Sequence, residues 1–564
     1  MSKPSNETES HEIHDTKTCN TSCSASSTLS ELEDDKPLSS LTRTSTHATA
    51  RAADDDDLEL PYLTITHPTR NTVQSEHPSF EVTFGHDDPE NPLNWPTWYK
   101  AYTIGAMSFA SCVVILFSTS YTSGMPGMMA EFHVTNKPVA TLGVTFYLLG
   151  LSVGSLILAP FSEVFGRRPV YSVAMGMFCI LVLPCALAGN LETVLVVRFC
   201  AAVVGSAMMA NSPGTVADIS SPTYRALCFS IWSLGPMSGP VLGPIIGGFA
   251  YQYLGWRWTN WIVMILAGLA WLMVSSVKES YAPVILKRKA ATIRAATGED
   301  QWTSRYDEPV PVLRLLATNL QRPFVLTFTE PILWFWDLYV AVCYATYYLC
   351  FVAYPIVFRD IRGWSASMSG LAFSGMGVGT VLAIASEPLA RRLINRYPRE
   401  PHSGRVAPEA CVSIVCIAAV LTPLGQLWFT WTATPTSTHW IWSILSGVPF
   451  AAGQTLIFIY ANSYIASSYG LYSASALCGN LVVRSVVGGT LILAGQQMYH
   501  TMSPHWAGTL IGLVQVVCIG IPLAFFRLGR SIRQRSPALQ ELLAAQNITR
   551  DDAAAEKGAS AASQ

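Results

Sequence analysis

Apolar runs recur at short intervals along the chain from about residue 100 to residue 526. Each run is close to the roughly 20 residues that an α-helix needs to cross about 30 Å of hydrocarbon. Because lipid offers no hydrogen bonds to an open backbone, such runs predict helices, whereas strands of a membrane barrel need only about 10 residues of alternating polarity. The twelve predicted spans cover residues 101–120, 139–159, 170–188, 193–216, 227–251, 258–277, 331–353, 366–386, 411–430, 440–461, 473–495 and 506–526. The expected fold is therefore an all-α polytopic membrane protein with twelve transmembrane helices.

The longest polar interruption, residues 278–322, divides the predicted spans into two groups of six. This segment and the other connections on its side are rich in Arg and Lys, and positive charge marks the cytosolic side of a membrane protein. We therefore expect both termini and the central loop in the cytosol. We also expect the membrane to be the plasma membrane. The expected organisation is a disordered cytosolic tail over 1–86, a six-helix bundle over 87–277, a cytosolic central loop over 278–322, a second six-helix bundle over 323–530 and a cytosolic tail over 531–564.

Composition supports a membrane protein and excludes several other classes. Hydrophobic residues make up 50% of the chain and charged residues 13%, about half of the roughly 25% that is usual in soluble domains. The net charge of −2 provides no basic field for nucleic acid. The 13 cysteines lack zinc-ligand spacing, so neither a metal site nor a disulfide framework is expected. The first 86 residues are rich in Ser, Thr, Asp and Glu, which predicts disorder.

A short charged turn connects the second and third predicted spans, where the chain reads Ser-Glu-Val-Phe-Gly-Arg-Arg-Pro over residues 162–169. Glycine permits a tight turn, and an arginine here can pair with a carboxylate on a neighbouring helix end. Such a pair can hold one face of a transporter shut and release it on rearrangement; the alternative is topogenic charge alone. The residues expected to form this cytosolic gate are Glu163, Gly166, Arg167, Arg168, Asp218 and Arg225.

The fifth predicted span combines glycine and proline in a regular repeat. Glycine recurs at every fourth position from Gly235 to Gly247, so these residues share one stripe along which another helix can approach closely. Three prolines in the same span each lack an N–H and bend the helix. Generic small-residue packing would explain the glycines but not the repeated Gly-Pro pairs. The residues that define this pattern are Gly235, Gly239, Pro240, Gly243, Pro244, Gly247 and Gly248.

Together these features resemble the major facilitator superfamily, and within it the fungal twelve-span drug:proton antiporters. Further marks of this resemblance are Asp-Pro-Glu-Asn-Pro-Leu-Asn-Trp-Pro at 88–96 and Gly-Trp-Arg-Trp at 255–258. The resemblance implies two six-helix bundles that rock around a central cavity. It also implies proton-coupled efflux of a small organic molecule, which would be a drug, a toxin or secondary metabolite, or a polyamine. The partners implied are the lipid bilayer, the substrate and protons, with the protein acting as a monomer and without a cofactor.

Several polar residues stand at membrane depth and are candidates for the cavity. Asp337 lies about two turns inside the seventh span, where burial disfavours the charged carboxylate and suits a group that takes up and releases a proton. The rival interpretation is an entrance charge paired with an arginine, for which Arg484 is a candidate. Arg198 in the fourth span either faces the bundle interior as part of a relay or extends to the outer headgroups. The other candidates are Asn211, Tyr344, Gln454 and Asn462.

The aromatic residues of the seventh span have two interpretations as well. Tyr344, Tyr347, Tyr348 and Phe351 either wall a cavity for flat or cationic substrates or face lipid. For the whole protein, the first alternative function is a proton-coupled uptake permease of the same fold, since fold does not settle function. A more remote alternative is a membrane receptor or a membrane-embedded enzyme. The sequence contains no phosphate-cradling loop and no catalytic constellation at membrane depth, so an enzyme is not expected.

Overall fold

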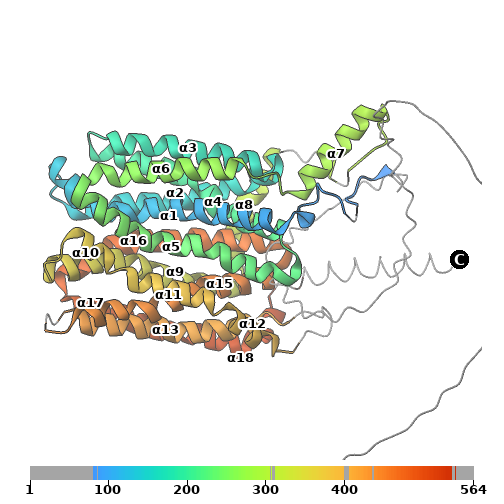
Figure 1. Cartoon of the computed structure of the whole chain (residues 1–564). Coiled ribbons are helices and arrows are strands. Elements are labelled where there is room, and N and C mark those ends of the chain that lie inside the picture. Colours follow the sequence, from blue (N-terminus) through green and yellow to red (C-terminus); the bar gives the residue numbers. More distant parts are fainter. Residues whose placement is uncertain are drawn as a thin grey trace, which may run out of the picture. The chain divides into compact units, whose positions relative to one another are not determined.

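The computed structural model describes residues 80–85, 87–304, 306–307, 312–398, 406–434, 437–536 and 540. Within these residues the chain is almost wholly helical, with one isolated β-bridge between Glu81 and Thr303. Long helices lie side by side, those of the first half coloured blue to green and those of the second half yellow to red (Figure 1). The tails expected over residues 1–86 and 531–564 lie mostly outside the described residues.

The first half contains α1 (Thr97–Glu131), α2 (Lys137–Phe165), α3 (Arg167–Leu187), α4 (Leu191–Ile219), α5 (Pro222–Leu254) and α6 (Trp256–Ser275). The connecting segment contains α7 (Ala282–Thr297) and α8 (Val312–Thr329). The second half contains α9 (Pro331–Tyr354), α10 (Ala366–Leu371), α11 (Ser374–Ala385), α12 (Glu387–Asn395), α13 (Glu409–Ala433), α14 (Trp440–Leu445), α15 (Gly447–Tyr469), α16 (Ser473–Thr501), α17 (Pro504–Cys518) and α18 (Gly520–Gln534). Short helical turns are η2 (Pro92–Asn94), η3 (Pro355–Ile361) and η4 (Gly470–Tyr472).

Eleven helical stretches in the described part of the chain are long and apolar enough to cross a membrane. α5 is not among them because repeated glycine and proline lower its hydropathy, yet it packs closely along α1. With α5, these helices account for the twelve predicted spans in order. Three predicted spans consist of two helices each, α10 with α11, α14 with α15, and α17 with α18. The apolar pattern continues across these breaks, so it does not mark them.

The same packing plan occurs in both halves. In the first half α1 packs on α5, α2 on α4, and α3 on α6. In the second half the helices at corresponding positions do the same, with α9 on α16, α11 on α15, and α13 on α17 and α18. The halves meet along α2 and α16 and along α5 with α10 and α11. This is the arrangement expected of a membrane protein built from two structural repeats.

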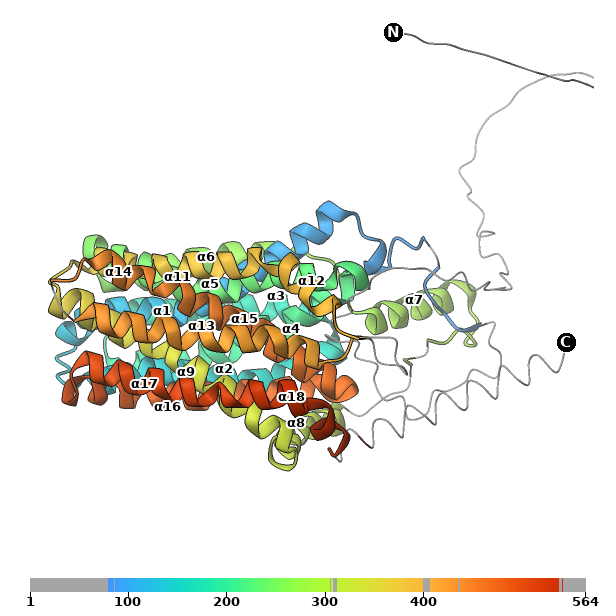
Figure 2. The same ribbon diagram turned by 90° about the horizontal axis from the view of Figure 1, so that it is seen from below.

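The two ends of the helices differ in what they carry. In both views α7 and α12 lie at one end, which we call the loop end, and α17 lies at the other, which we call the far end (Figures 1 and 2). The gate turn at Gly166 belongs to the loop end, because a side chain there would contact Glu279 and Val284 next to and within α7. The gate turn with Arg167 and Arg168 therefore lies at the same end as α12, which contains Arg391 and Arg392.

The glycine stripe of α5 lies against α1. A Cβ atom added to Gly239 would lie 2.8 Å from the carbonyl oxygen of Cys112, and one added to Gly247 would lie 2.8 Å from that of Ser120. Contacts this short are not tolerated by real side chains, so only glycine lets the two backbones approach to this distance. The stripe that faces α1 consists of Gly235, Gly239, Gly243 and Gly247.

Hydroxyl groups of α1 donate hydrogen bonds to carbonyls of α5, one of which has lost its helical partner to a proline. Pro236 has no N–H for the carbonyl of Trp232 four residues earlier, and the hydroxyl of Ser108 donates to that carbonyl at 3.0 Å instead. Side-chain hydroxyls on a neighbouring helix are one of the few ways to satisfy such carbonyls in lipid. Two further α1 hydroxyls donate to α5 carbonyls, Thr119 to Gly239 at 3.4 Å and Ser123 to Pro244 at 3.3 Å.

The segment between the halves contains two helices that the apolar pattern did not predict. α7 forms a small core with the chain before α1, in which Val82, Leu286 and Ala290 are buried together. Asp88 forms an ion pair with Lys289 of α7. Burial raises the pKa of Asp88, but hydrogen bonds from Lys289 and from backbone N–H groups outweigh it and hold the pKa below its ordinary value. α8 packs on α16 and α2.

Candidate functional site

A cavity lies between the two halves and is lined by α1, α4 and α5 from the first and by α9, α15 and α16 from the second. The volume of this cavity is about 50 Å³. That volume holds a few waters and is too small for a drug-sized ligand, so a substrate requires the walls to move. The lining of this central cavity is Ile115, Met209, Pro236, Met237, Pro240, Val340, Cys343, Tyr344, Tyr347, Tyr348, Gln454, Ile457, Phe458 and Arg484.

A second cavity, which we call the inner cavity, continues from the first towards the loop end. Its volume measured in the same way is about 120 Å³. Met209, Phe458 and Arg484 line both cavities, so the two meet at these side chains. Glu163 and Arg167 of the gate turn line the inner cavity. The two cavities together therefore reach from the middle of the protein towards the loop end.

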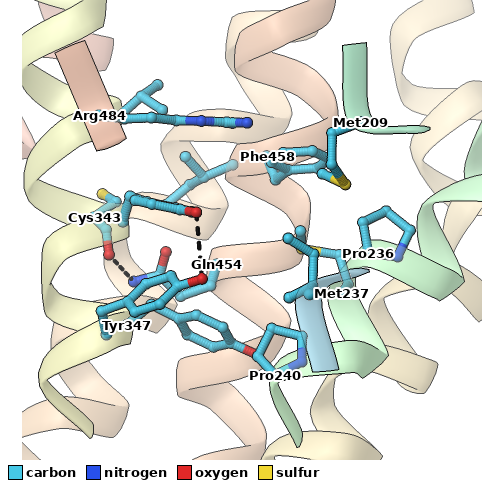
Figure 3. Close-up of a pocket in the computed structure, with 14 residues that line it drawn as sticks. Met209, Pro236, Met237, Pro240, Cys343, Tyr347, Gln454, Phe458 and Arg484 are labelled. Carbon is cyan, nitrogen blue, oxygen red and sulfur yellow. Dashed lines mark hydrogen bonds between the residues drawn. The ribbon is translucent and has the colours of Figure 1, made fainter. Parts of the chain in front are cut away.

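Polar groups are few in the central cavity and each has a defined position. The Gln454 side-chain amide donates to the carbonyl oxygen of Cys343 at 2.9 Å. The hydroxyl of Tyr344 donates to that of Tyr348 at 3.5 Å. In Figure 3, Arg484 and Cys343 lie on one side of the cavity, while Met209, Pro236 and Met237 lie on the other. The second half thus supplies the polar groups and the first half supplies an apolar wall.

Arg484 is deeply buried in the protein, and its side chain lines both cavities. Its guanidinium carbon lies 5.1 Å from the centre of the Tyr344 ring and 5.2 Å from that of Phe458. The residue is 7% exposed. Among the residues that the structure describes, none forms an ion pair with it, and its Nε atom lacks a hydrogen-bond partner. Arg484 is therefore a buried cation whose charge is balanced only by two aromatic faces.

Asp337 lies in α9 just behind the wall of the inner cavity. Its Oδ1 atom accepts a hydrogen bond of 2.8 Å from the Asn480 side-chain amide, and its Oδ2 atom has no partner within the described chain. Asn480 lines the inner cavity, whereas Asp337 lines neither cavity. In this conformation the expected alternative of a pair with an arginine is not formed. Arg484 lies one turn beyond Asn480 on the same face of α16 but does not contact Asp337.

Arg198 lies inside the first half rather than at a membrane surface. Its side chain is fully buried and donates to the carbonyl oxygens of Gly143 at 2.9 Å, Phe117 at 3.1 Å and Ser118 at 3.1 Å. The guanidinium also lies 4.3 Å from the centre of the Tyr121 ring. These contacts join α4 to α1 and α2. Arg198 lines neither cavity, so its observed contacts are those of an internal cross-link between three helices.

The gate turn is held by charges within the first half. The predicted pairing of an arginine with a carboxylate on a neighbouring helix end is present, since Arg167 Nε donates to Asp218 of α4 at 2.7 Å. Arg168 donates to the carbonyl of Ser275 at 3.4 Å. Gly166 has a φ of +95°, a backbone conformation that strongly favours glycine. None of these contacts reaches the second half, which is consistent with the inner cavity extending between the halves at this end.

Glu279 organises this turn, and sequence reasoning did not identify it. Its carboxylate accepts from the backbone N–H groups of Arg167 at 3.0 Å and Arg168 at 3.1 Å, at the start of α3. It also accepts from the N–H groups of Ser280 at 3.1 Å and Tyr281 at 3.0 Å. A carboxylate at this position satisfies N–H groups that have no partner within their helix and complements the helix dipole. Its position directly after the sixth span was the only signal in the sequence.

Replacing Glu279 with alanine should destabilise the first half. The change leaves up to four buried or partly buried N–H groups without an acceptor, and the expected loss is about 1–3 kcal/mol in the free energy of unfolding. Thermal unfolding of the detergent-solubilised protein measures the effect. The matched control is Glu192→Ala, an exposed carboxylate in the first turn of α4, for which we expect little change. Equal melting temperatures of the Glu279 variant and the wild type would contradict the capping role.

At the far end the two halves are in close contact. A Cβ atom on Gly248 of α5 would lie 2.6 Å from the carbonyl oxygen of Ala366, and one on Gly370 of α10 would lie even closer to that of Pro244. The Gln252 side-chain oxygen accepts from the backbone N–H of Ser367 at 2.9 Å. On the other interface, the hydroxyl of Thr145 in α2 donates to the Gly489 carbonyl in α16 at 2.7 Å. The structure is therefore closed at the far end.

Most of the polar and aromatic candidates from the sequence lie at one of the two cavities. Tyr344, Gln454 and Arg484 meet at the central cavity, as do Tyr347 and Tyr348, whereas the ring of Phe351 stacks on Phe373. Asn211 and Asn462 line the inner cavity and donate to the carbonyls of Leu158 and Phe458. Arg225 lies in the first turn of α5. Asn480, Met209 and Phe458 were missed, although Asn480 stands four residues before Arg484.

Comparisons with known proteins give a consistent result. The family model described as Major Facilitator Superfamily matches residues 107–526. The chain is 38% identical over 459 residues to the ascochitine biosynthesis cluster MFS transporter of Didymella fabae, covering 80% of this chain and 88% of that protein. It is 32% identical over 480 residues to efflux pump FUBT of Fusarium oxysporum, covering 84% and 79%. The structure of the proton:xylose symporter XylE bound to 6-bromo-6-deoxy-D-glucose matches with a TM-score of 0.56 at 14% identity, over 77% of this chain and 96% of that chain.

Proposed function

Since this chain belongs to the major facilitator superfamily, we propose that it is a proton-coupled efflux transporter for a small organic molecule. The observation that carries the proposal is the cavity between the halves, which is lined from both and extends to the loop end while the far end is closed. Rocking of the halves about this cavity would close the loop end and open the far end. The protein acts as a monomer in the plasma membrane, with the loop end and both termini in the cytosol.

Export rather than uptake is supported by the names of two relatives. The relative from Fusarium oxysporum is named an efflux pump, and the one from Didymella fabae is named for a biosynthesis cluster, which favours a drug, toxin or secondary metabolite as the cargo. The glycine-lined α5 lies at both the α1 contact and the contact between the halves. A helix in this position transmits movement of the first half to the second.

Proton coupling is assigned to Asp337. An unpaired charged oxygen at this depth is costly, and Oδ2 of Asp337 has no partner within the described chain. This conformation therefore favours Asp337 with its proton bound. Asn480 connects the carboxyl to the inner cavity, from which the proton leaves to the cytosol. Inward proton movement supplies about 2.3 kcal/mol per 100 mV of membrane potential, in addition to the pH gradient.

An efflux assay in cells tests the direction and the energy source together. Cells that lack their own pumps would express the chain, and mass spectrometry would compare the internal and external amounts of a panel of drugs and fungal metabolites. We expect at least one compound to be depleted inside the cell, and a protonophore to restore its internal level. A compound that instead accumulates inside in a proton-dependent manner would make the protein an uptake permease.

A further inference from the structure

We propose that the central cavity binds an organic anion, a flat molecule with one carboxylate or an equivalent acidic oxygen group, and that Arg484 is its counter-charge. The inference rests on the proposed transport function and narrows its substrate class. It starts from Arg484, which is more than nine-tenths buried, lines both cavities and has no ion-pair partner within the described residues. A guanidinium is charged at every physiological pH, so this cavity carries a permanent positive charge.

The rest of the protein shows how buried arginines are normally balanced. Arg167 pairs with Asp218, and Arg198 donates to three carbonyl oxygens. Arg484 has only the faces of Tyr344 and Phe458. Charged groups buried in a membrane protein are paired or serve a ligand pathway. The missing partner of Arg484 is therefore supplied by the cargo, and a planar guanidinium fits a carboxylate through two parallel hydrogen bonds.

The remaining walls describe the body of the ligand. The first half contributes Ile115, Met209 and Met237, all apolar, with Pro236 and Pro240 beside them, and the second half contributes tyrosine rings. Sulfur atoms and aromatic rings favour a flat, largely apolar molecule. The Tyr344 hydroxyl and the Gln454 amide offer polar contacts at one side. The ligand therefore carries its charge at the α16 side and its apolar body towards α5.

This arrangement excludes the polyamines that the family resemblance leaves open. A cationic ligand would meet Arg484 at close range in a site from which water is largely excluded, and like charges repel strongly there. Among the described residues, no carboxyl group lines the central cavity. Asp337 lies behind Asn480 and lines neither cavity, and Glu163 lines the inner cavity at the gate turn. The tyrosines, which by themselves suit cations as well as flat rings, are therefore assigned to a flat anion.

Binding to the purified full-length protein in nanodiscs tests the assignment with matched pairs of compounds. The probes are 1-naphthoate, 2-naphthoate and anthracene-9-carboxylate, the primary amide of each, and spermidine. We expect wild type to bind acids about ten- to a hundredfold tighter than their amides, as for one charged hydrogen-bonded pair. In Arg484→Gln the acid-to-amide ratio falls to about one, and Arg484→Lys retains part of it. The control Arg359→Gln, which changes an arginine close to Tyr251 and away from the cavities, keeps the wild-type ratio.

Three results would overturn the anion site. They are equal affinity of wild type for acids and amides, a preserved acid preference in Arg484→Gln, and tighter binding of spermidine than of every acid. A melting experiment separates a ligand site from a structural anchor. We expect Arg484→Leu to raise the melting temperature of the ligand-free protein because it removes an uncompensated buried charge; a lowered melting temperature would assign Arg484 a structural role.

Transport measurements distinguish failure of this inference from failure of the proposed function. If acids bind through Arg484 but no acid leaves the cytosol in vesicle assays, the anion site stands and the efflux function fails. If neutral amides are exported as rapidly as the acids, efflux stands and the anion site fails.

Discussion

Asparagine in place of Asp337 should reduce proton-driven export to the level of membranes without the transporter. Asparagine keeps the volume of the side chain and an oxygen for the hydrogen bond from Asn480, so folding and delivery to the membrane are preserved. It cannot exchange a proton, and the cycle loses its coupling to the pH gradient. The measurement is substrate movement in inside-out vesicles with an imposed pH gradient. Exchange of labelled for unlabelled substrate without a gradient should persist, because it needs no net proton transfer.

The matched control is Glu330→Gln. Glu330 directly precedes α9 and is also buried, but its Oε2 atom accepts hydrogen bonds from Ser536 at 2.5 Å and Tyr469 at 3.3 Å. An amide oxygen retains these bonds, and we expect export to continue. Wild-type export by the Asp337 variant would remove it as the proton carrier. Equal loss in both variants would show that export needs a carboxyl near the start of α9 for stability rather than for coupling.

Valine in place of Gly370 should trap the transporter with the far end open. The added side chain meets the Pro244 carbonyl across the contact between α10 and α5, and this contact exists only when the far end is closed. Overpacking of this kind costs about 1–3 kcal/mol, which shifts the balance between the two conformations by about five- to 150-fold. Export should fall by a similar factor, although each half keeps its own packing.

Thiol labelling reports the trapped state. Ser367→Cys places a thiol next to the Gln252 contact at the far end, and a membrane-impermeant reagent added outside should label it faster when Gly370 is valine. The control is Gly105→Val in α1, where an added side chain meets no atom within 4 Å. Unchanged labelling together with normal export would show that the α5–α10 contact does not govern the closed state.

The number and order of the membrane helices could be predicted because each needs an apolar run of defined length. The ends and breaks of the helices could not. α10 and α11 together occupy one predicted span, since a break between them changes the backbone but not the hydropathy. α7 was missed because it contains no long apolar run. It is held by a small core in which its own Leu286 is buried together with Val82. Hydropathy reports the surrounding solvent, whereas these features depend on contacts between distant segments.

The sequence predicted which residues belong to the candidate site better than it predicted the role of each. Arg484, Tyr344 and Gln454 come together at one cavity, and their polarity at membrane depth was the signal. Arg198 carries the same signal but is satisfied by carbonyl oxygens of two neighbouring helices. Composition shows that a buried charge needs compensation and does not show which backbone groups lie close enough to provide it. That distinction requires the packing of α1, α2 and α4.

The hydroxyls of Ser108, Thr119 and Ser123 on carbonyls of α5 have a consequence for engineering. A chimera that takes α5 alone from a relative separates these carbonyls from the first helix that supplied their hydroxyl partners. The carbonyl of Trp232, which has no N–H partner because Pro236 stands four residues later, is left unsatisfied in lipid unless a serine or threonine stands opposite it. The two segments should therefore be exchanged as a pair, and hybrids that split them should be degraded before they reach the cell surface.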